Sequence, residues 1–148
     1  MHELKYHRSL HVLHDIEAIV RGHAYVADFL RGAVLVPVPL HPRKERERGY
    51  NQSVLLAECF ARAAGDTGVD CLLRRVLDTQ TQTTLSREAR RTNLKNAFAV
   101  AQGASIRPER HYVLVDDVFT TGSTLNACAR VLRRAGASNL DVVTFGHG

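Results

Sequence analysis

Two adjacent carboxylates, Asp116 and Asp117, stand between an apolar run and a segment rich in hydroxyl groups. Carboxylates accept hydrogen bonds from sugar hydroxyls and help to hold divalent cations. The segment TTGST that follows is typical of a helix N-terminus, where free backbone N–H groups and the positive end of the helix dipole attract phosphate. A site for sugar hydroxyls next to a site for one phosphate group predicts a ribose 5-phosphate as the ligand. The predicted phosphate loop consists of Thr120, Thr121, Gly122, Ser123 and Thr124.

Each of these residues also has an explanation that needs no ligand, because acids can simply end a strand and hydroxyls can simply cap a helix. The segment is not a Walker A motif, since no Gly-Lys-[Ser/Thr] sequence closes it. We favour a binding site because paired acids, a glycine loop with hydroxyls and a helical pattern follow one another without interruption.

The pattern of apolar residues predicts the elements that position this site. Helices are expected at residues 9–21, at 52–65 with Gly65 as the stop, and at 122–135; strands are expected at 33–39, 71–77, 96–101, 111–117 and 139–146. The charged segment LHPRKERERGYNQ (40–52) and the polar segment 78–95 are expected to be loops. Asn51 is expected to cap the helix that follows it, with ligand contact as the alternative for Asn51 and Gln52.

Strands that alternate with helices predict an α/β fold of three layers, a mainly parallel, Rossmann-like sheet flanked by helices. Ligands bind beyond the carboxyl ends of the strands in such sheets. The charged segment and the acidic segment both leave strands at that edge. We therefore expect the strand to end at Asp116 and Asp117, and both carboxylates to reach into the crevice above the sheet.

Composition limits the classes of function. The 148 residues suit one domain, and the 45% hydrophobic and 24% charged content is typical of a soluble globular protein. The net charge of +5 permits anionic partners, either phosphorylated small molecules or nucleic acid. No segment has the apolar length of a membrane span or of a signal peptide, so we expect a cytoplasmic location.

Cysteines and histidines offer weaker signals. An odd number of widely spaced cysteines argues against a disulfide framework and a CxxC zinc site, and all three are expected to be buried. His7, His11 and His14 would share a helix face, where a solvated polar face is favoured over a metal site. The cysteines are Cys59, Cys71 and Cys128.

The stretch VLVDDVFTTGST resembles the PRPP-binding motif of type I phosphoribosyltransferases. The stretches LKYHRS, VPVPLHPRKERERGYNQS and TQTQTTLSREARRTNLKNAFAV resemble the ComF family of phosphoribosyltransferase-like proteins, some of which are linked to competence and DNA uptake. The resemblance extends from Leu4 to Val143. It implies a type I phosphoribosyltransferase fold in which residues 1–148 form a single domain.

The resemblance also implies roles for the residues. Asp116 and Asp117 would hold the ribose hydroxyls and, directly or through ribose or water, Mg²⁺, and the TTGST loop would hold the 5-phosphate. The loop at 78–95 would be a mobile hood over PRPP. Cations would stabilise the charge that develops on the departing pyrophosphate, with Arg48 as the strongest candidate for catalysis. The cations assigned to the pyrophosphate and the hood are Arg43, Lys44, Arg46, Arg87 and Arg91.

Two departures from the family pattern leave the function open. Many ComF proteins carry an N-terminal cysteine-rich zinc module, which we expect this chain to lack, so that a separate zinc-ribbon chain is a possible partner. Some purine transferases have an acid that serves as a base where this chain has Thr120, so the acceptor is undetermined.

Three functions therefore remain. The first is a Mg²⁺-dependent phosphoribosyltransferase of nucleotide metabolism with an unknown acceptor. The second is a non-catalytic competence factor that binds single-stranded DNA or the uptake machinery, and the third is a regulator that senses PRPP. Parallel folds of this size often pair, so a homodimer is one expectation for the oligomeric state.

Overall fold

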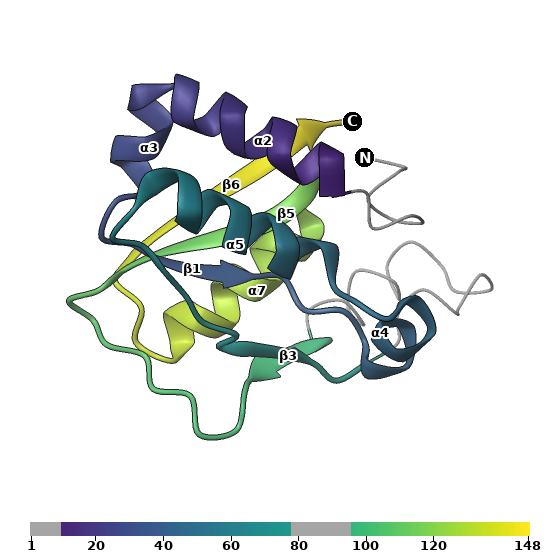
Figure 1. The fold of residues 1–148 in the computed structure, drawn as a ribbon. Coiled ribbons are helices and arrows are strands. Elements are labelled where there is room, and N and C mark those ends of the chain that lie inside the picture. Colours follow the sequence, from purple (N-terminus) through teal and green to yellow (C-terminus); the bar gives the residue numbers. More distant parts are fainter. Residues whose placement is uncertain (1–9, 78–95) are drawn as a thin grey trace.

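The computed structural model describes residues 10–77 and 96–148. Helices and strands alternate along most of the chain (Figure 1). The helices are α2 (Leu10–Gly22), α3 (Ala24–Leu30), α4 (Pro42–Arg48), α5 (Gln52–Ala64) and α7 (Ser123–Arg134). The strands are β1 (Val34–Pro37), β2 (Gly68–Val69), β3 (Leu73–Arg75), β4 (Phe98–Val100), β5 (His111–Phe119) and β6 (Asn139–His147).

The main sheet contains four strands in the order β2-β1-β5-β6, and every pair in it is parallel. β5 lies in the middle, pairing with β1 from Val34↔Tyr112 to Pro37↔Val115 and with β6 from His111↔Asn139 onward. The α/β class and the parallel sheet predicted from the sequence are thereby confirmed. All carboxyl ends lie at one edge of the sheet, so the segments that follow β1 and β5 emerge together.

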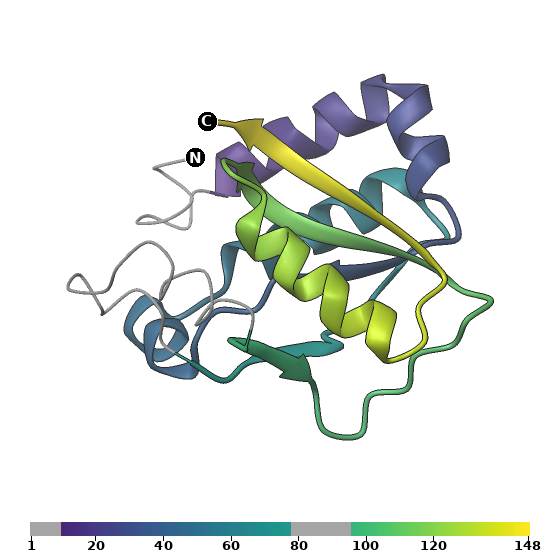
Figure 2. The same cartoon turned by 180° about the vertical axis from the view of Figure 1, so that it is seen from behind.

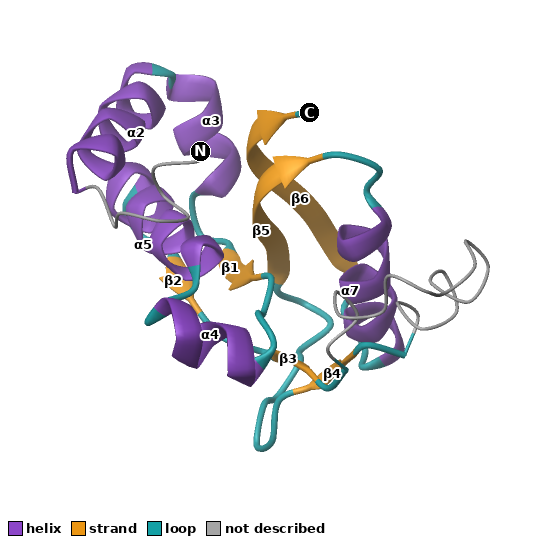
Figure 3. Cartoon of the chain, turned by 90° about the vertical axis from the view of Figure 1, so that its right-hand side faces the viewer, coloured by secondary structure: helices purple, strands orange, loops and turns teal. Residues whose placement is uncertain are grey.

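Two apolar cores cover the two faces of this sheet (Figure 3). One core packs α2, α3 and α5 against odd-numbered residues of β5, such as Val113 and Val115. The other packs α7 against even-numbered residues, such as Tyr112 and Leu114. Successive strand residues point to opposite faces, and an unbroken apolar run is what a strand buried on both sides requires. Seen from behind, α7 lies in front of the sheet and runs below the yellow strand β6 in the view (Figure 2).

The predicted strand at 71–77 is present but shorter than predicted, and it lies outside the main sheet. Only Leu73–Arg75 is a strand, and it pairs antiparallel with β4 in a separate two-stranded sheet. The strand that extends the main sheet beyond β1 is instead β2, which is two residues long. Cys71 is exposed, contrary to expectation, whereas Cys59 and Cys128 are buried as predicted.

The charged segment at 40–52 is not simply a loop, because Pro42–Arg48 forms helix α4. Pro42 occupies the first turn, where its missing N–H costs nothing. The side chain of His41 accepts a hydrogen bond from the amide of Arg43 at 3.3 Å, and Gly49 ends the helix with a left-handed φ of 81°. Helix α3, which has seven residues and no side-chain cap, was not predicted from the sequence.

The other helix predictions agree with the structure to within two residues at each end: 9–21 corresponds to α2, 52–65 to α5 and 122–135 to α7. The strands predicted at 33–39, 96–101 and 139–146 correspond to β1, β4 and β6. The hood predicted at 78–95 lies outside the described residues. Over the described part of the chain, no helix combines the length and apolar character that crossing a membrane requires.

Candidate functional site

A small hollow lies where β5 ends and α7 begins, at the carboxyl edge of the sheet. Its volume is about 30 Å³. Five of the residues predicted to bind ligand contribute to its wall, together with three apolar residues. The predicted residues are Asp116, Thr120, Gly122, Ser123 and Thr124, and the apolar ones are Val118, Phe119 and Leu125. The structure thus brings a carboxylate, three hydroxyls and a helix N-terminus around one space.

The loop before α7 takes its shape from Gly122. This residue is the N-cap of α7 and has a φ of 69°, a left-handed conformation that glycine adopts without strain. A Cβ placed on it would lie 3.0 Å from the ring of Phe119. Gly122 has no side chain to cap the helix, so N–H groups of the first turn remain available to another acceptor. One of these groups, the Ser123 amide, donates a long hydrogen bond of 3.4 Å to Oγ1 of Thr121.

Hydroxyl groups of the loop lie at the surface. Thr120, Thr121 and Ser123 are exposed, and Thr124 is half-buried. The hydroxyls of Thr121 and Ser123 lie 2.9 Å apart and share one hydrogen bond. Thr121 does not line the hollow, whereas the other four predicted loop residues do. Exposed donors beside a helix N-terminus are suited to a phosphate that arrives from solvent.

The strand does not end at the two carboxylates, contrary to the sequence prediction. β5 continues to Phe119, since Asp116 pairs with Thr144 and Val118 pairs with Gly146 of β6. The alternation of a continuing strand therefore separates the two acids. Asp116 lines the hollow, whereas Asp117 is only 6% exposed and does not line it. The expectation that both carboxylates reach one crevice is wrong for this conformation.

Asp116 is held by two hydrogen bonds. Its Oδ1 accepts from the hydroxyl of Ser53 at 3.1 Å and from the amide of Asp117 at 2.9 Å. Asp117 in turn accepts a hydrogen bond from the amide of Val118 at 2.9 Å. The two bonds to Asp116 fix its carboxylate at the wall of the hollow.

Burial raises the pKa of Asp116 to about 6 from its ordinary value of 3.8, and the adjacent Asp117 carboxylate acts in the same direction. The hydrogen bonds from the Asp117 amide and the Ser53 hydroxyl oppose this rise, because they stabilise the ionised form. A buried carboxylate with a perturbed pKa beside a hollow is typical of a functional site, although structural networks produce such shifts as well.

A buried polar group lies at the start of α5, and of its three residues only Ser53 was not predicted from the sequence as a candidate for the site. Asn51, Gln52 and Ser53 are 6%, 7% and 2% exposed. Asn51 caps α5 as predicted, accepting from the Ser53 amide at 2.9 Å, and it also donates to the carbonyl of Val38 at 2.9 Å. Three adjacent polar residues before an apolar helix were the available signal. Nothing local could show that Ser53 meets a strand 63 positions away.

The predicted cations lie mostly on α4, which is on the α5 side of the sheet (Figure 3). Arg48 is half-buried and donates a short hydrogen bond to Oε1 of Gln52. Arg43 forms an exposed ion pair with Glu47 at 3.5 Å. Among the described residues, no basic side chain lines the hollow at α7. Lys44 and Arg46 complete the set on α4, while Arg87 and Arg91 lie outside the described residues.

The oxygen atoms beside the hollow suit magnesium in kind but are few in number. Carboxylate and hydroxyl oxygens are the hard ligands that Mg²⁺ prefers, and Asp116 supplies one beside the hollow. Within residues 10–77 and 96–148, no group of three or more His, Cys, Asp or Glu side chains could hold a metal alone. The residues therefore fit a Mg²⁺ that is bound by one or two carboxylates and mainly by the phosphates of a ligand, which is its usual mode.

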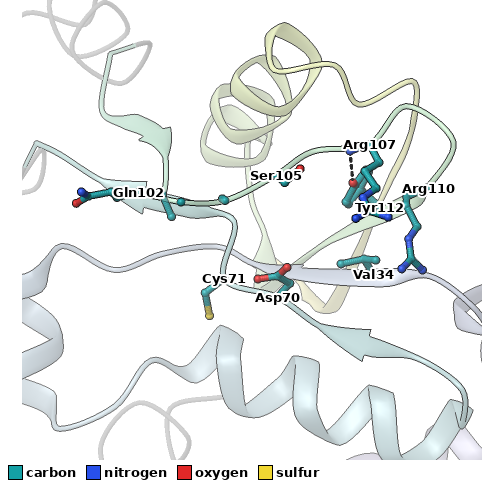
Figure 4. Close-up of a pocket in the computed structure, with 11 residues that line it drawn as sticks. Val34, Asp70, Cys71, Gln102, Ser105, Arg107, Arg110 and Tyr112 are labelled. Carbon is teal, nitrogen blue, oxygen red and sulfur yellow. Dashed lines mark hydrogen bonds between the residues drawn. The ribbon is translucent and has the colours of Figure 1, made fainter.

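Two larger hollows lie at the opposite end of the sheet. One has a volume of about 480 Å³ and extends from Val34 and Tyr112, at the amino ends of β1 and β5, to the 101–110 segment (Figure 4). A second, of about 700 Å³, adjoins it and shares Asp70 and Arg110. Both hollows are open to solvent, and both are lined by acidic as well as basic side chains. Ligands of parallel sheets bind at the carboxyl edge, so we place the candidate site at the small hollow despite its size.

Comparison with known proteins bears on this site. The family model described as Phosphoribosyl transferase domain matches residues 51–146. Competence protein F of Haemophilus influenzae is 43% identical over 108 residues, which cover 73% of this chain and 47% of that protein. DNA utilization protein YhgH of Escherichia coli K12 is 36% identical over 149 residues, covering 96% of this chain and 63% of that protein. The matched part of this chain therefore corresponds to 47% of the length of the first relative and 63% of the length of the second.

Solved structures share the fold. A hypoxanthine phosphoribosyltransferase from Staphylococcus aureus aligns with a TM-score of 0.54 and 17% identity, covering 89% of this chain and 62% of that chain. A purine phosphoribosyltransferase from Pyrococcus horikoshii aligns with a TM-score of 0.52 and 11% identity, covering 94% of this chain and 75% of that chain. The predicted type I phosphoribosyltransferase fold is confirmed by these alignments.

Proposed function

This chain belongs to the phosphoribosyl transferase domain family and within it to the ComF-type proteins, and from that premise we propose that it binds PRPP and transfers the phosphoribosyl group to an acceptor. The proposal includes Mg²⁺ as the cofactor and pyrophosphate as the second product. It treats residues 1–148 as one phosphoribosyltransferase-like domain with the 78–95 segment as its hood.

One observation carries the proposal most strongly. Asp116 and four of the five residues of the loop at 120–124 line the same hollow, although a ribose hydroxyl and a 5-phosphate make different chemical demands. A carboxylate accepts hydrogen bonds from hydroxyls, whereas a helix N-terminus with exposed hydroxyl donors binds an anion. A sugar phosphate satisfies both at once. The 30 Å³ hollow is far smaller than PRPP, so the ligand would extend from it across the open carboxyl edge of the sheet.

The residues take the following proposed roles. The first-turn amides of α7 and the hydroxyls of the TTGST loop bind the 5-phosphate, and Gly122 permits the close approach of the phosphate to the backbone. Asp116 accepts a hydrogen bond from a ribose hydroxyl. Asp117 acts as the second carboxylate of the pair by resemblance to the family motif, and its burial requires a local change before it can meet a ligand directly.

Cations act at the pyrophosphate end. In the proposed reaction the bond from C1 of the ribose to the pyrophosphate oxygen breaks with its electron pair leaving on that oxygen. A nitrogen of the acceptor then forms the new bond to C1 and loses a proton. Arg48 and its neighbours on α4 stabilise the negative charge on the leaving group, most strongly in the transition state. Mg²⁺, when bound, would neutralise part of the same charge.

The experiment measures thermal stability with PRPP and Mg²⁺ together. We expect PRPP to raise the melting temperature, because a ligand that binds only the folded state stabilises it. The double variant Asp116→Asn, Asp117→Asn should lose this rise. A rise of equal size in the double variant would contradict the site assignment. Pyrophosphate release, assayed across nucleobases and amines, then tests transfer itself.

A second function is supported by the names of the relatives. They are called Competence protein F, Competence protein ComFC and DNA utilization protein. Under this alternative the chain binds single-stranded DNA or competence machinery without catalysis, or senses PRPP for a partner, including a separate zinc-ribbon chain. DNA binding to a protein with a net charge of +5 should weaken steeply with salt. Stabilisation by PRPP with no pyrophosphate release would favour the sensing role, and tight strand binding without a PRPP effect would favour the DNA role.

A further inference from the structure

Strand β6 forms one edge of the described sheet. It pairs with β5 on one side, and no other described strand pairs with it on the second side. The strand is nine residues long, from Asn139 to His147, and Figure 2 shows it in yellow alongside β5. A long edge strand presents a row of backbone N–H and C=O groups to which another strand can bind.

β6 is apolar but poorly buried within one copy of the chain. None of its nine residues is fully buried, whereas five residues of β5 are. Val142, on the face covered by α7, is 47% exposed, and Phe145, on the opposite face, is 37% exposed. Two of the large exposed apolar side chains therefore lie on this edge strand, one on each face of the sheet.

The edge also lacks the features that keep an edge strand from pairing. Proteins protect edges with lysine, proline or a bulge. β6 contains no lysine and no proline. Its one carboxylate, Asp141, lies 2.9 Å from Nε2 of His111 on the neighbouring strand, so its charge is already partly satisfied. Nothing in the side chains of β6 therefore opposes a second strand.

The sequence of β6 is complementary to itself about Thr144. In an antiparallel pair centred there, Thr144 lies opposite the partner's Thr144, and Val143 lies opposite the partner's Phe145. Threonine pairs and aromatic pairs with β-branched residues each stabilise neighbouring antiparallel strands. An interface in which the same surface meets itself about a two-fold axis is the commonest arrangement of soluble oligomers.

We propose that a second copy of this chain is the occupant of the edge: two β6 strands pair antiparallel about a two-fold axis at Thr144 and join two four-stranded sheets into one. This dimer leaves the carboxyl edge of each β5 open, so the interface is separate from the candidate ligand site. It does not depend on the proposed enzymatic function.

A cysteine crosslink tests the register. In a Cys71→Ser background, which removes the exposed native thiol, Thr144→Cys should give a covalent dimer with a thiol crosslinker that spans roughly 5 Å, the distance between neighbouring strands. Val142→Cys is the matched control on the same face. Its thiols would lie about four residue steps apart, roughly 13 Å, and should not crosslink. Crosslinking of the control but not of Thr144→Cys would overturn the register.

The mass in solution tests the dimer itself. Light scattering or sedimentation of the unmodified chain should give twice the monomer mass, and Val142→Lys with Phe145→Lys should halve it while thermal unfolding stays cooperative. A monomeric unmodified chain at the highest soluble concentration overturns the proposal. A dimer that survives both lysine substitutions overturns it as well, since the interface would then lie elsewhere or involve another segment of the chain.

Discussion

The hydroxyl of Ser53 donates a hydrogen bond of 3.1 Å to Oδ1 of Asp116, although 63 positions separate the two residues. This contact joins the start of α5 to the middle strand of the sheet at the wall of the candidate site. Asp116 is buried on one side by protein and open to the hollow on the other. Its position therefore depends on how α5 packs as much as on its own strand.

Ser53→Ala should weaken the site without unfolding the protein. The hydrogen bond lost to a partly buried carboxylate predicts a fall of about 1–2 kcal/mol in the free energy of unfolding. If the proposed function is correct, PRPP affinity should also fall, because the carboxylate is no longer held at the hollow. Urea unfolding and PRPP titration measure the two effects. The exposed Ser105 gives a control, Ser105→Ala, which should change neither; an equal loss in both variants would contradict the role of Ser53.

The pKa of Asp116 predicts a pH-dependent stability. Because the folded-state pKa is raised to about 6 from 3.8, the folded protein holds this proton more tightly than the unfolded chain does. The resulting stabilisation is fully present below about pH 4 and is lost as the pH rises through about 6. Asp116→Asn removes the buried charge, so it should stabilise the protein at pH 8 by up to about 3 kcal/mol and have little effect at pH 4.

Urea unfolding between pH 4 and pH 8 tests this dependence. Asp15→Asn, at an exposed position of α2, serves as the control and should show no such trend. A variant Asp116→Asn that is less stable than the unmodified chain at pH 8 would show that the hydrogen bonds to the carboxylate outweigh the cost of its burial.

Gly122→Ala should affect both the loop and the site. A Cβ at this position meets the ring of Phe119 at 3.0 Å and the residue must keep a φ of 69°. The strain of the left-handed conformation predicts a loss of about 1–2 kcal/mol of stability, and displacement of Phe119 should add to it. Gly103 also has a positive φ, 77°, but open space around it. Gly103→Ala should therefore show the conformational cost alone, and calorimetry of both variants separates the two effects.

Asn51→Ala should be the most destabilising of these single changes. It removes the N-cap hydrogen bond to the Ser53 amide and leaves the Val38 carbonyl without its donor. A lost cap costs about 1 kcal/mol and a buried carbonyl left unsatisfied costs a further amount of about 1–2 kcal/mol. The exposed Asn126 of α7 provides the control variant Asn126→Ala. Chemical unfolding that gives the same midpoint for both would contradict the structural role of Asn51.

Local sequence signals predicted the elements whose causes are local. The apolar run of β5, the periodic apolar face of α7 and the cap at Asn51 each depend on residues within a few positions of one another. The helix at α4 carried such signals too, in Pro42 and Gly49, but the density of its charges favoured the interpretation as a loop. The sequence predicted a strand at β3 but not its antiparallel pairing, because its partner β4 follows it only after a long intervening segment.

From the amino-acid sequence alone came the α/β class, the family resemblance and the residue types that suit a sugar phosphate, since these depend on composition and on order along the chain. Only the tertiary structure decided that Asp116 faces the hollow while Asp117 is buried, and that Ser53 holds the former. The physical reason is that β6 extends β5 past the carboxylates, and that burial and hydrogen bonding at this point come from segments distant in sequence. The residue pattern of β5 alone contains no information about its pairing with β6 or about the distant segments that bury its carboxylates.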